Sequence, residues 1–198
     1  MRFHKLHVEA GFFLQTAVLL LLFPFPWVIA MIIAGAAHEV GHLIALKAMN
    51  ITIYGLRLRA GGAYVETSQI ALKEEAIASL SGPILGISLL AISRWAPRVA
   101  LCGAIHGLYN LIPIYPYDGG RAVTAALRAI LPVHTVSTVC RIIKWMFCIT
   151  VIIFSLWLFL IMRMGVSILL PGLILLIKAF APDNPSLDNF SLRDKLAL

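Results

Sequence analysis

Residues 36–43, AAHEVGHL, place an HExxH pattern at the end of a long apolar stretch. No charged residue occurs from Ala10 to Ala37, and then Glu39 follows between two histidines. Residues four apart share one helix face, so His38 and His42 can reach one metal ion while Glu39 lies beside it. Ionisable residues at membrane depth are costly and usually belong to a functional site. The stretch therefore predicts a metalloprotease site within a membrane.

Two other interpretations of the pattern deserve comparison. In soluble helices HExxH often arises by chance as part of a polar face, but here the surrounding residues are apolar and leave no solvated face. The two histidines could also form a structural pair that hydrogen-bonds to neighbouring helices. Retention of Glu39 beside them favours the hydrolytic interpretation.

The composition indicates an integral membrane protein. Hydrophobic residues make up 61% of the 198-residue chain and charged residues 13%, and the mean hydropathy is +0.94. Soluble domains contain about 45–50% apolar and about 25% charged residues. The net charge of +7 comes from basic residues scattered through short loops, which is typical of loops facing anionic lipid and argues against nucleic-acid binding. The three cysteines form no CxxC pair and are interpreted as small buried hydrophobes.

The expected fold class is an all-α polytopic membrane protein with about six transmembrane helices. The first apolar region is too long for the core of a signal peptide, so we expect it to be retained. The spans are expected at about residues 6–23, 27–49, 73–93, 99–114, 139–162 and 166–180. Residues 122–136 have an amphipathic or interfacial pattern. One domain is expected over residues 1–181, with a catalytic core of about 27–121 and a short polar tail at 182–198.

Between spans two and three the periodicity changes from helical to alternating. Residues 51–67 alternate apolar and polar side chains around Gly61-Gly62, a pattern that predicts a small β-hairpin. In span three, Gly82 and Gly86 are four residues apart, and small residues at this spacing allow helices to pack closely.

The distribution of basic residues predicts the orientation in the cell membrane. With six spans and a cytoplasmic amino terminus, thirteen of the sixteen Lys and Arg residues lie on the cytoplasmic side, and only Arg94, Arg98 and Arg163 lie outside. Spans two and four then both run toward the cytoplasm. The active site is therefore expected toward the cytoplasmic face.

A catalytic zinc ion usually has three protein ligands, and HEVGH supplies two of them. Asp118 is favoured as the third because it follows span four, at the same membrane face as the motif. It also lies in a break rich in Pro and Gly, and irregular backbone at membrane depth is tolerated around a cavity or the protein interior. A helix-capping role for Asp118 is the alternative. The other candidate ligands are His106, which we interpret mainly as a packing residue, and Glu66, Glu74, His4 and His7.

Three ordered motifs resemble those of the site-2 protease family of intramembrane zinc peptidases. They are HEVGH at 38–42, the GxxxG-like SGPILG at 81–86, and NLIPIYPYDGG at 110–120, which matches Asn-x-x-Pro-x-x-Pro-x-Asp-Gly. The similarity covers residues 27–121. The sequences GGAYVE at 61–66 and LKEE at 72–75 are most similar to the sporulation-type members, such as stage IV sporulation protein FB. In contrast to those members, we expect this protein to have no carboxy-terminal CBS domain, and residues 1–198 show no PDZ insertion.

The resemblance and the ligand chemistry imply the same set of roles. His38, His42 and Asp118 would hold Zn²⁺, which lowers the pKa of its bound water and polarises the scissile carbonyl. Glu39 would act as the general base and then as the acid for the leaving amine. Asn110 is suited to hydrogen-bonding the substrate or the oxyanion, with a role in helix–helix hydrogen bonding as the alternative.

The expected substrate is a membrane-spanning or membrane-tethered protein, and the resemblance implies a regulatory protein such as a sigma factor, with sporulation as the biological context. A membrane regulatory protein and an oligomer are compatible with this interpretation, and the lipid bilayer is the surrounding partner. The contrasting hypothesis is a membrane scaffold or transporter without proteolytic activity, in which HEVGH forms a structural or transport zinc site.

Overall fold

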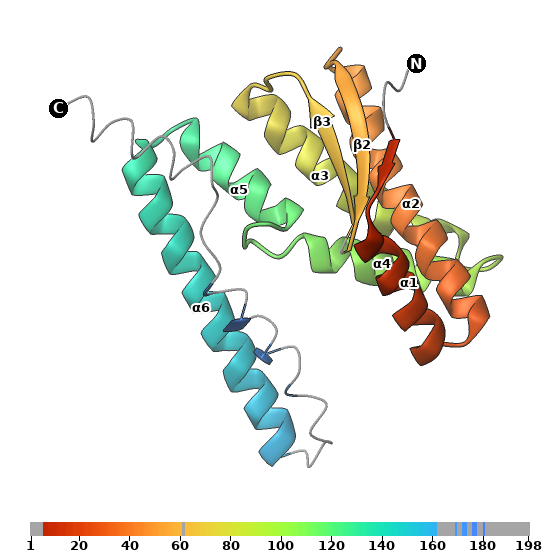
Figure 1. Ribbon diagram of the computed structural model, residues 1–198. Coiled ribbons are helices and arrows are strands. Elements are labelled where there is room, and N and C mark those ends of the chain that lie inside the picture. The colour runs from red at the N-terminus through yellow and green to blue at the C-terminus, as the bar shows by residue number, and fades with distance from the viewer. Residues whose placement is uncertain are drawn as a thin grey trace.

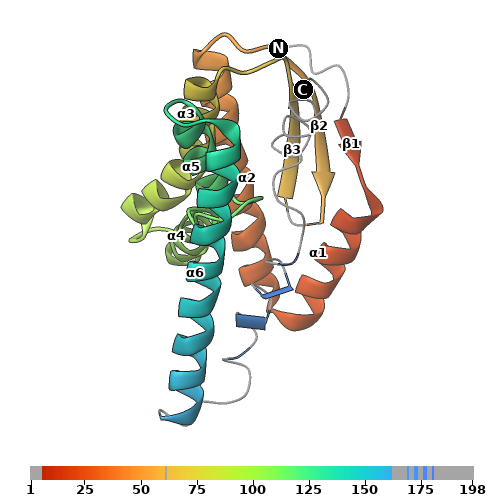
Figure 2. The same cartoon turned by 90° about the vertical axis from the view of Figure 1, so that its left-hand side faces the viewer.

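Helix α2, Phe25–Ala48, carries the HEVGH motif and lies beside the strands of a small sheet (Figure 1). The computed structural model describes residues 6–60 and 62–161, together with 169, 172–173, 176–177 and 180. The other described helices are α1 Ala10–Leu22, α3 Leu72–Ser88, the 3-10 turn η1 Leu89–Ile92, α4 Pro97–Asn110, α5 Asp118–Arg128 and α6 Val133–Leu160. Figure 2 shows α1 and a small sheet on one side of α2, with α3 to α6 on the other.

Local sequence explains where α2 begins and ends. Pro24 precedes its first residue and Pro26 lies in the first turn. Backbone N–H groups in the first turn of a helix have no carbonyl partner within the helix, so proline is tolerated there. At the other end Asn50 has a φ of +58°, in the left-handed region that asparagine tolerates, and the backbone N–H of Ile51 bonds to the carbonyl of Leu46. The helix therefore stops shortly after the motif and turns into the sheet.

The sheet has three strands in the order β1-β2-β3: Leu6–Val8, Ile53–Arg59 and Gly62–Thr67. The antiparallel pair β2–β3 confirms the predicted hairpin. The prediction of span one from residue 6 was wrong at its start, because Leu6–Val8 pairs in parallel with Leu56–Leu58 and helix α1 begins only at Ala10. The hydrogen-bond partners of β1 lie on the edge of β2, fifty residues further along the chain. No local pattern in the sequence indicates this pairing.

Small residues let the helices around α2 approach closely. Helices α2, α3 and α4 pack against one another, and α5 packs on α3. A Cβ added at Gly41 would lie 2.6 Å from the carbonyl oxygen of Ser81, so the close crossing of α2 and α3 requires glycine. At the start of α5, a side chain on Gly119 would collide with the backbone of Leu111. The predicted close packing of the GxxxG-like segment is confirmed.

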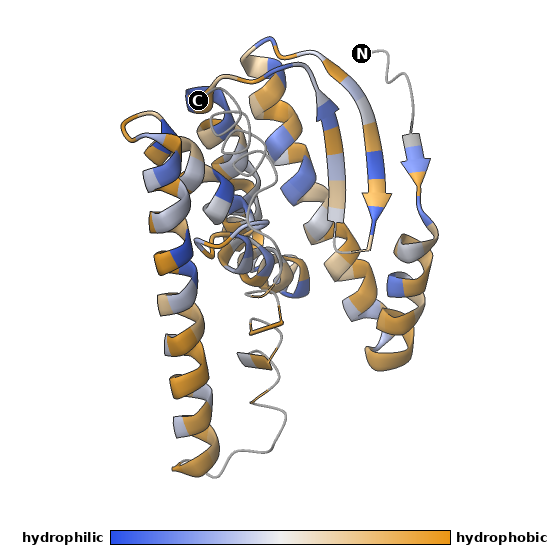
Figure 3. Ribbon diagram, turned by 60° about the vertical axis from the view of Figure 1, so that its left-hand side comes forward, coloured by the Kyte–Doolittle hydropathy of each residue, from blue (hydrophilic) through white to orange (hydrophobic). Residues whose placement is uncertain are grey.

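Three described helices are long and apolar enough to cross a membrane: Phe25–Ala48, Leu72–Ile92 and Val133–Leu160. Figure 3 shows the largely hydrophobic carboxy-terminal half of α6. Helix α1 has 13 residues and α4 has 14, so each is about 20 Å long and shorter than the hydrocarbon core of about 30 Å. Predicted span six falls mostly outside the described residues, and the six-span count stays a prediction.

Two boundaries near the site differ from those expected. The amphipathic segment begins at Asp118, and α5 buries Ala122 and Ala125 within the protein instead of lying free at the membrane surface. Helix α6 begins at Val133, before the expected start of span five, because Pro132 caps it in an extended conformation.

Candidate metal centre

Helices α2 and α5 bring His38, His42 and Asp118 together. The Nε2 atom of His38 lies 3.0 Å from Oδ2 of Asp118 and 3.1 Å from Nε2 of His42. Nε2 of His42 lies 3.2 Å from the same Asp118 oxygen. His38 and Asp118 are buried and His42 is nearly so. Three ligand-type atoms from residues 80 positions apart in sequence thus converge on one point.

The spacing of these atoms fits a metal ion of the size of zinc. Ligands bonded to a tetrahedral zinc at about 2.0–2.1 Å lie roughly 3.3 Å from one another. The three distances approach this value. Without a cation, lone pairs on two imidazole nitrogens and a carboxylate oxygen would face one another in a buried space, which is unfavourable. Among the described residues, these two histidines and the aspartate form the trio of ligand-type side chains that could hold a metal ion.

Neighbouring groups orient the candidate ligands. Nδ1 of His42 donates to the carbonyl oxygen of Ala78 on α3 at 2.7 Å, which directs the lone pair of Nε2 toward His38 and Asp118. The ring of His38 packs edge-to-face against His106, with centroids 4.6 Å apart. Nδ1 of His38 is buried without a hydrogen-bond partner among the described residues, so packing fixes this ring. His106 thus packs against the trio and is not a member of it.

The Asp118 carboxylate has a second neighbour on its other oxygen. Oδ1 lies 3.9 Å from a guanidinium nitrogen of Arg121, one turn along α5. Burial alone would raise the pKa of the Asp118 carboxyl, but the neighbouring His38 and His42 side chains outweigh burial and hold this pKa below its usual value. Asp118 occupies the first turn of α5, yet its side chain faces the histidines and not the helix backbone.

The other predicted third ligands have partners elsewhere. Glu66 pairs with Arg57 across the β2–β3 hairpin, and Glu74 accepts a hydrogen bond from the backbone N–H of Ala71 at the start of α3. His7 lies in β1, and its neighbour in the sheet is Arg57. His4 falls outside the described residues.

Glu39 lies beside the trio and is held by the sheet. The backbone N–H of Ala63, at the start of β3, donates to Oε1 of Glu39 at 3.3 Å. Glu39, Ala63, the trio and Asn110 line one cavity of about 430 Å³. The side-chain amide of Asn110 donates to the carbonyl of His106 in its own helix at 3.0 Å. The roles of Glu39 and Asn110 stay predictions.

Sequence reasoning missed three contributors to this site. They are the N–H of Ala63, the carbonyl of Ala78 and the close approach of Gly82, where an added Cβ would collide with the His42 ring. The SGPILG segment predicted close packing at Gly82 but not that its neighbour would be a candidate metal ligand. Backbone donors and acceptors such as those of Ala63 and Ala78 leave no residue signature.

Comparison with known proteins agrees with the motifs. No family model matches the chain. A curated zinc metalloprotease of Methanocaldococcus jannaschii is 28% identical over 113 residues, covering 50% of this chain and 33% of that protein. Among solved structures, the site-2 protease from Methanocaldococcus jannaschii superposes with a TM-score of 0.60 at 22% identity, covering 88% of each chain. This chain has the site-2 protease fold.

The predicted resemblance to the site-2 proteases is thereby confirmed at the level of the fold. The alignment with the curated zinc metalloprotease spans about a third of that protein's length. Similarity to the sporulation-type subgroup stays a prediction. The site-2 protease fold and the three apolar helices support a location in the membrane.

Proposed function

We propose that this protein is an intramembrane zinc metalloendopeptidase that hydrolyses a peptide bond within or next to a membrane-spanning segment. The observation that carries the proposal is the position of Glu39, which shares one cavity with the three candidate ligands. A scaffold or transporter needs ligands but gains nothing from a carboxylate positioned beside them. Loss of proteolysis in Glu39→Gln protein that still holds zinc is the result that tests the proposal.

In this proposal, His38, His42 and Asp118 hold the zinc ion. Zinc held there would act as a Lewis acid, lowering the pKa of its bound water toward about 7 and polarising the scissile carbonyl. Glu39 accepts the proton of the attacking water and returns it to the leaving amine. The Ala63 N–H keeps the Glu39 carboxylate directed into the cavity, and Asn110 donates to the substrate or the oxyanion.

The substrate segment must be unwound, since a helix hides its carbonyls in its own hydrogen bonds. Strand β3 lines the cavity of the metal centre, and within the described chain β2 is its neighbour on one side. In the proposal, the unwound segment adds to the other side of β3 as a further strand. That placement presents backbone carbonyls, not side chains alone, to Glu39 and the metal.

The finer parts of the proposal concern context. The protease domain covers residues 1–181 and its core 27–121, in a multi-pass protein of about six spans with the site toward the cytoplasm. The substrate is a membrane-tethered regulatory protein such as a sigma factor, as the similarity of residues 61–66 and 72–75 to sporulation-type proteases suggests. A membrane regulatory protein or a second copy of the chain is compatible with this arrangement.

Packing of α3 against His42 gives a first prediction. Gly82→Ala should lower zinc affinity by roughly 10- to 100-fold, the usual effect of disturbing a ligand's surroundings, because the new methyl displaces the His42 ring. Gly35→Ala is the matched control, since a Cβ there meets no atom within 4 Å. Zinc titration of the purified variants measures both. Wild-type affinity in Gly82→Ala would show that His42 tolerates displacement or is not a ligand.

The orientation gives a second prediction. Ile130 lies in the turn after α5 and Trp95 lies in the turn before α4. Both side chains are largely exposed. In a background lacking Cys102, Cys140 and Cys148, a cysteine at Trp95 should react with a membrane-impermeant thiol reagent in intact cells. A cysteine at Ile130 should react only in inverted vesicles. Labelling of the Ile130 position in intact cells would reverse the proposed topology and place the site toward the outside.

A further inference from the structure

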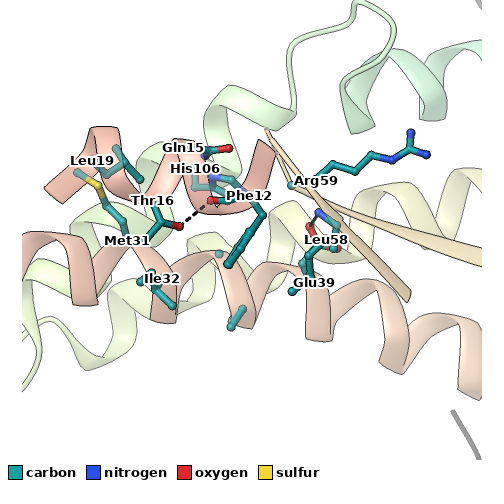
Figure 4. A pocket seen from close by; sticks show the side chains of 14 residues that line it. Phe12, Gln15, Thr16, Leu19, Met31, Ile32, Glu39, Leu58, Arg59 and His106 are labelled. Carbon is teal, nitrogen blue, oxygen red and sulfur yellow. Dashed lines mark hydrogen bonds between the residues drawn. The ribbon is translucent and has the colours of Figure 1, made fainter. Parts of the chain in front are cut away.

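A second cavity of about 440 Å³ adjoins the cavity of the metal centre (Figure 4). It lies between α1, α2 and the hairpin, and its volume is within the range of about 300–1,000 Å³ typical of ligand pockets. Its walls are mainly apolar and include Phe12 and Leu19 of α1, Met31 and Ile32 of α2, and Leu58 of β2.

The two cavities share part of their lining. Glu39, Gly62, Ala63 and His106 line both. The apolar cavity therefore lies directly next to the proposed general base and to the strand along which we place the substrate backbone. A substrate residue held next to Glu39 would therefore lie beside this cavity as well.

Two of the polar residues that line the apolar cavity, Thr16 and Arg59, make contacts within the protein. The Thr16 hydroxyl donates to the carbonyl of Phe12 at 2.9 Å. The Arg59 guanidinium pairs with Glu9 at 2.9 Å and lies 5.3 Å from the centre of the Tyr64 ring. Figure 4 shows the Arg59 side chain extending away from the cavity. The walls are thus mainly apolar and suit an apolar group, and the acidic side chain among them, Glu39, is the proposed general base.

Gly35 leaves room in this cavity. It lies one helical turn before Glu39 on α2, and a Cβ added to it meets nothing within 4 Å. Glycine inside a helix is less favourable than alanine, and no neighbouring atom excludes a side chain at Gly35. The missing side chain therefore contributes free volume next to Glu39, in contrast to Gly82, where contact with His42 excludes one.

We propose that this cavity is a specificity pocket for a large apolar side chain of the substrate, carried by one of the two residues flanking the scissile bond. Gly35 and Met31 set the size of side chain that fits. The proposal rests on the proposed proteolytic function and adds the substrate preference: peptide bonds flanked by Leu, Met or Phe are cleaved in preference to those flanked by Ala. Burial of the apolar side chain in the pocket is the source of the preference.

The test varies the pocket and the substrate together. The substrate is a single-span reporter with Ala, Leu or Phe at each position flanking the mapped cut, and the measurement is kcat/KM in detergent. Gly35→Leu should reduce the Phe-to-Ala preference by about 10- to 100-fold, the usual range for steric discrimination in an apolar pocket. Met31→Ala enlarges the pocket and should shift the preference toward Phe. Ile33→Phe adds volume at an exposed position of α2 outside the pocket and should leave the preference unchanged.

The outcomes separate this proposal from the proteolytic function itself. Cleavage with an unchanged Phe-to-Ala ratio in zinc-loaded Gly35→Leu overturns the proposed pocket and leaves the proposed proteolytic function intact. If Gly35→Leu fails to bind zinc, the Phe-to-Ala preference of Met31→Ala decides the question. An unchanged preference in Met31→Ala then overturns the proposal. Absence of all zinc-dependent cleavage in the wild type overturns the proposed function and the pocket with it.

Discussion

Replacing His38, His42 or Asp118 with alanine is expected to remove most of the zinc from the purified protein. The three ligand atoms lie 3.0–3.2 Å from one another, so each replacement leaves two ligands where a catalytic zinc site usually has three. Disturbing a neighbour of a ligand costs roughly 10- to 100-fold in affinity, and loss of a ligand should cost more than about 100-fold. The measurement is zinc content by elemental analysis after gel filtration, followed by titration of the stripped protein.

Two histidine controls make this experiment specific. His134 is exposed near the start of α6, so His134→Ala should retain wild-type zinc content. His106 packs against His38 without belonging to the trio, and His106→Ala should lower zinc affinity by about tenfold, the lower end of that range, because the contact is ring packing. Full zinc content in Asp118→Ala, together with zinc loss in His106→Ala, would show that the third ligand is His106.

Much of the metal centre follows from short-range rules applied to a few residues. The spacing of His38 and His42 places both on one helix face. The break at Asp118, combined with the inferred direction of the spans, placed its carboxylate at the same end of the membrane domain. Both expectations agree with the convergence of the three side chains in the structure. The hairpin was predictable because alternation around glycine is a local pattern.

The features that were not predictable depend on contacts between distant segments. Strand β1 exists because β2 offers it an edge, and Glu39 is held by a backbone N–H from β3. Gly82 lies against His42 because two helices cross there. Each of these depends on how the helices and the sheet assemble, which a single sequence does not encode in any short pattern.

Glu39→Gln is expected to abolish proteolysis while leaving zinc bound. The amide has nearly the shape of the carboxylate, and its oxygen can still accept the hydrogen bond from Ala63, so α2 and the hairpin should keep their packing. The amide cannot accept a proton from water at neutral pH. General acid–base groups contribute about 10²- to 10⁴-fold to rate, so turnover should fall by at least this factor.

The most direct test uses the purified protein reconstituted with a single-span reporter substrate. Wild-type protein and Glu39→Gln, matched for zinc content, are compared by the rate at which the cleaved fragment appears, before and after zinc removal by a chelator and its return. We predict cleavage by the zinc-loaded wild type alone, lost on chelation and restored by zinc. Equal cleavage by Glu39→Gln, or cleavage by the wild type that survives complete zinc removal, would contradict the proposed function.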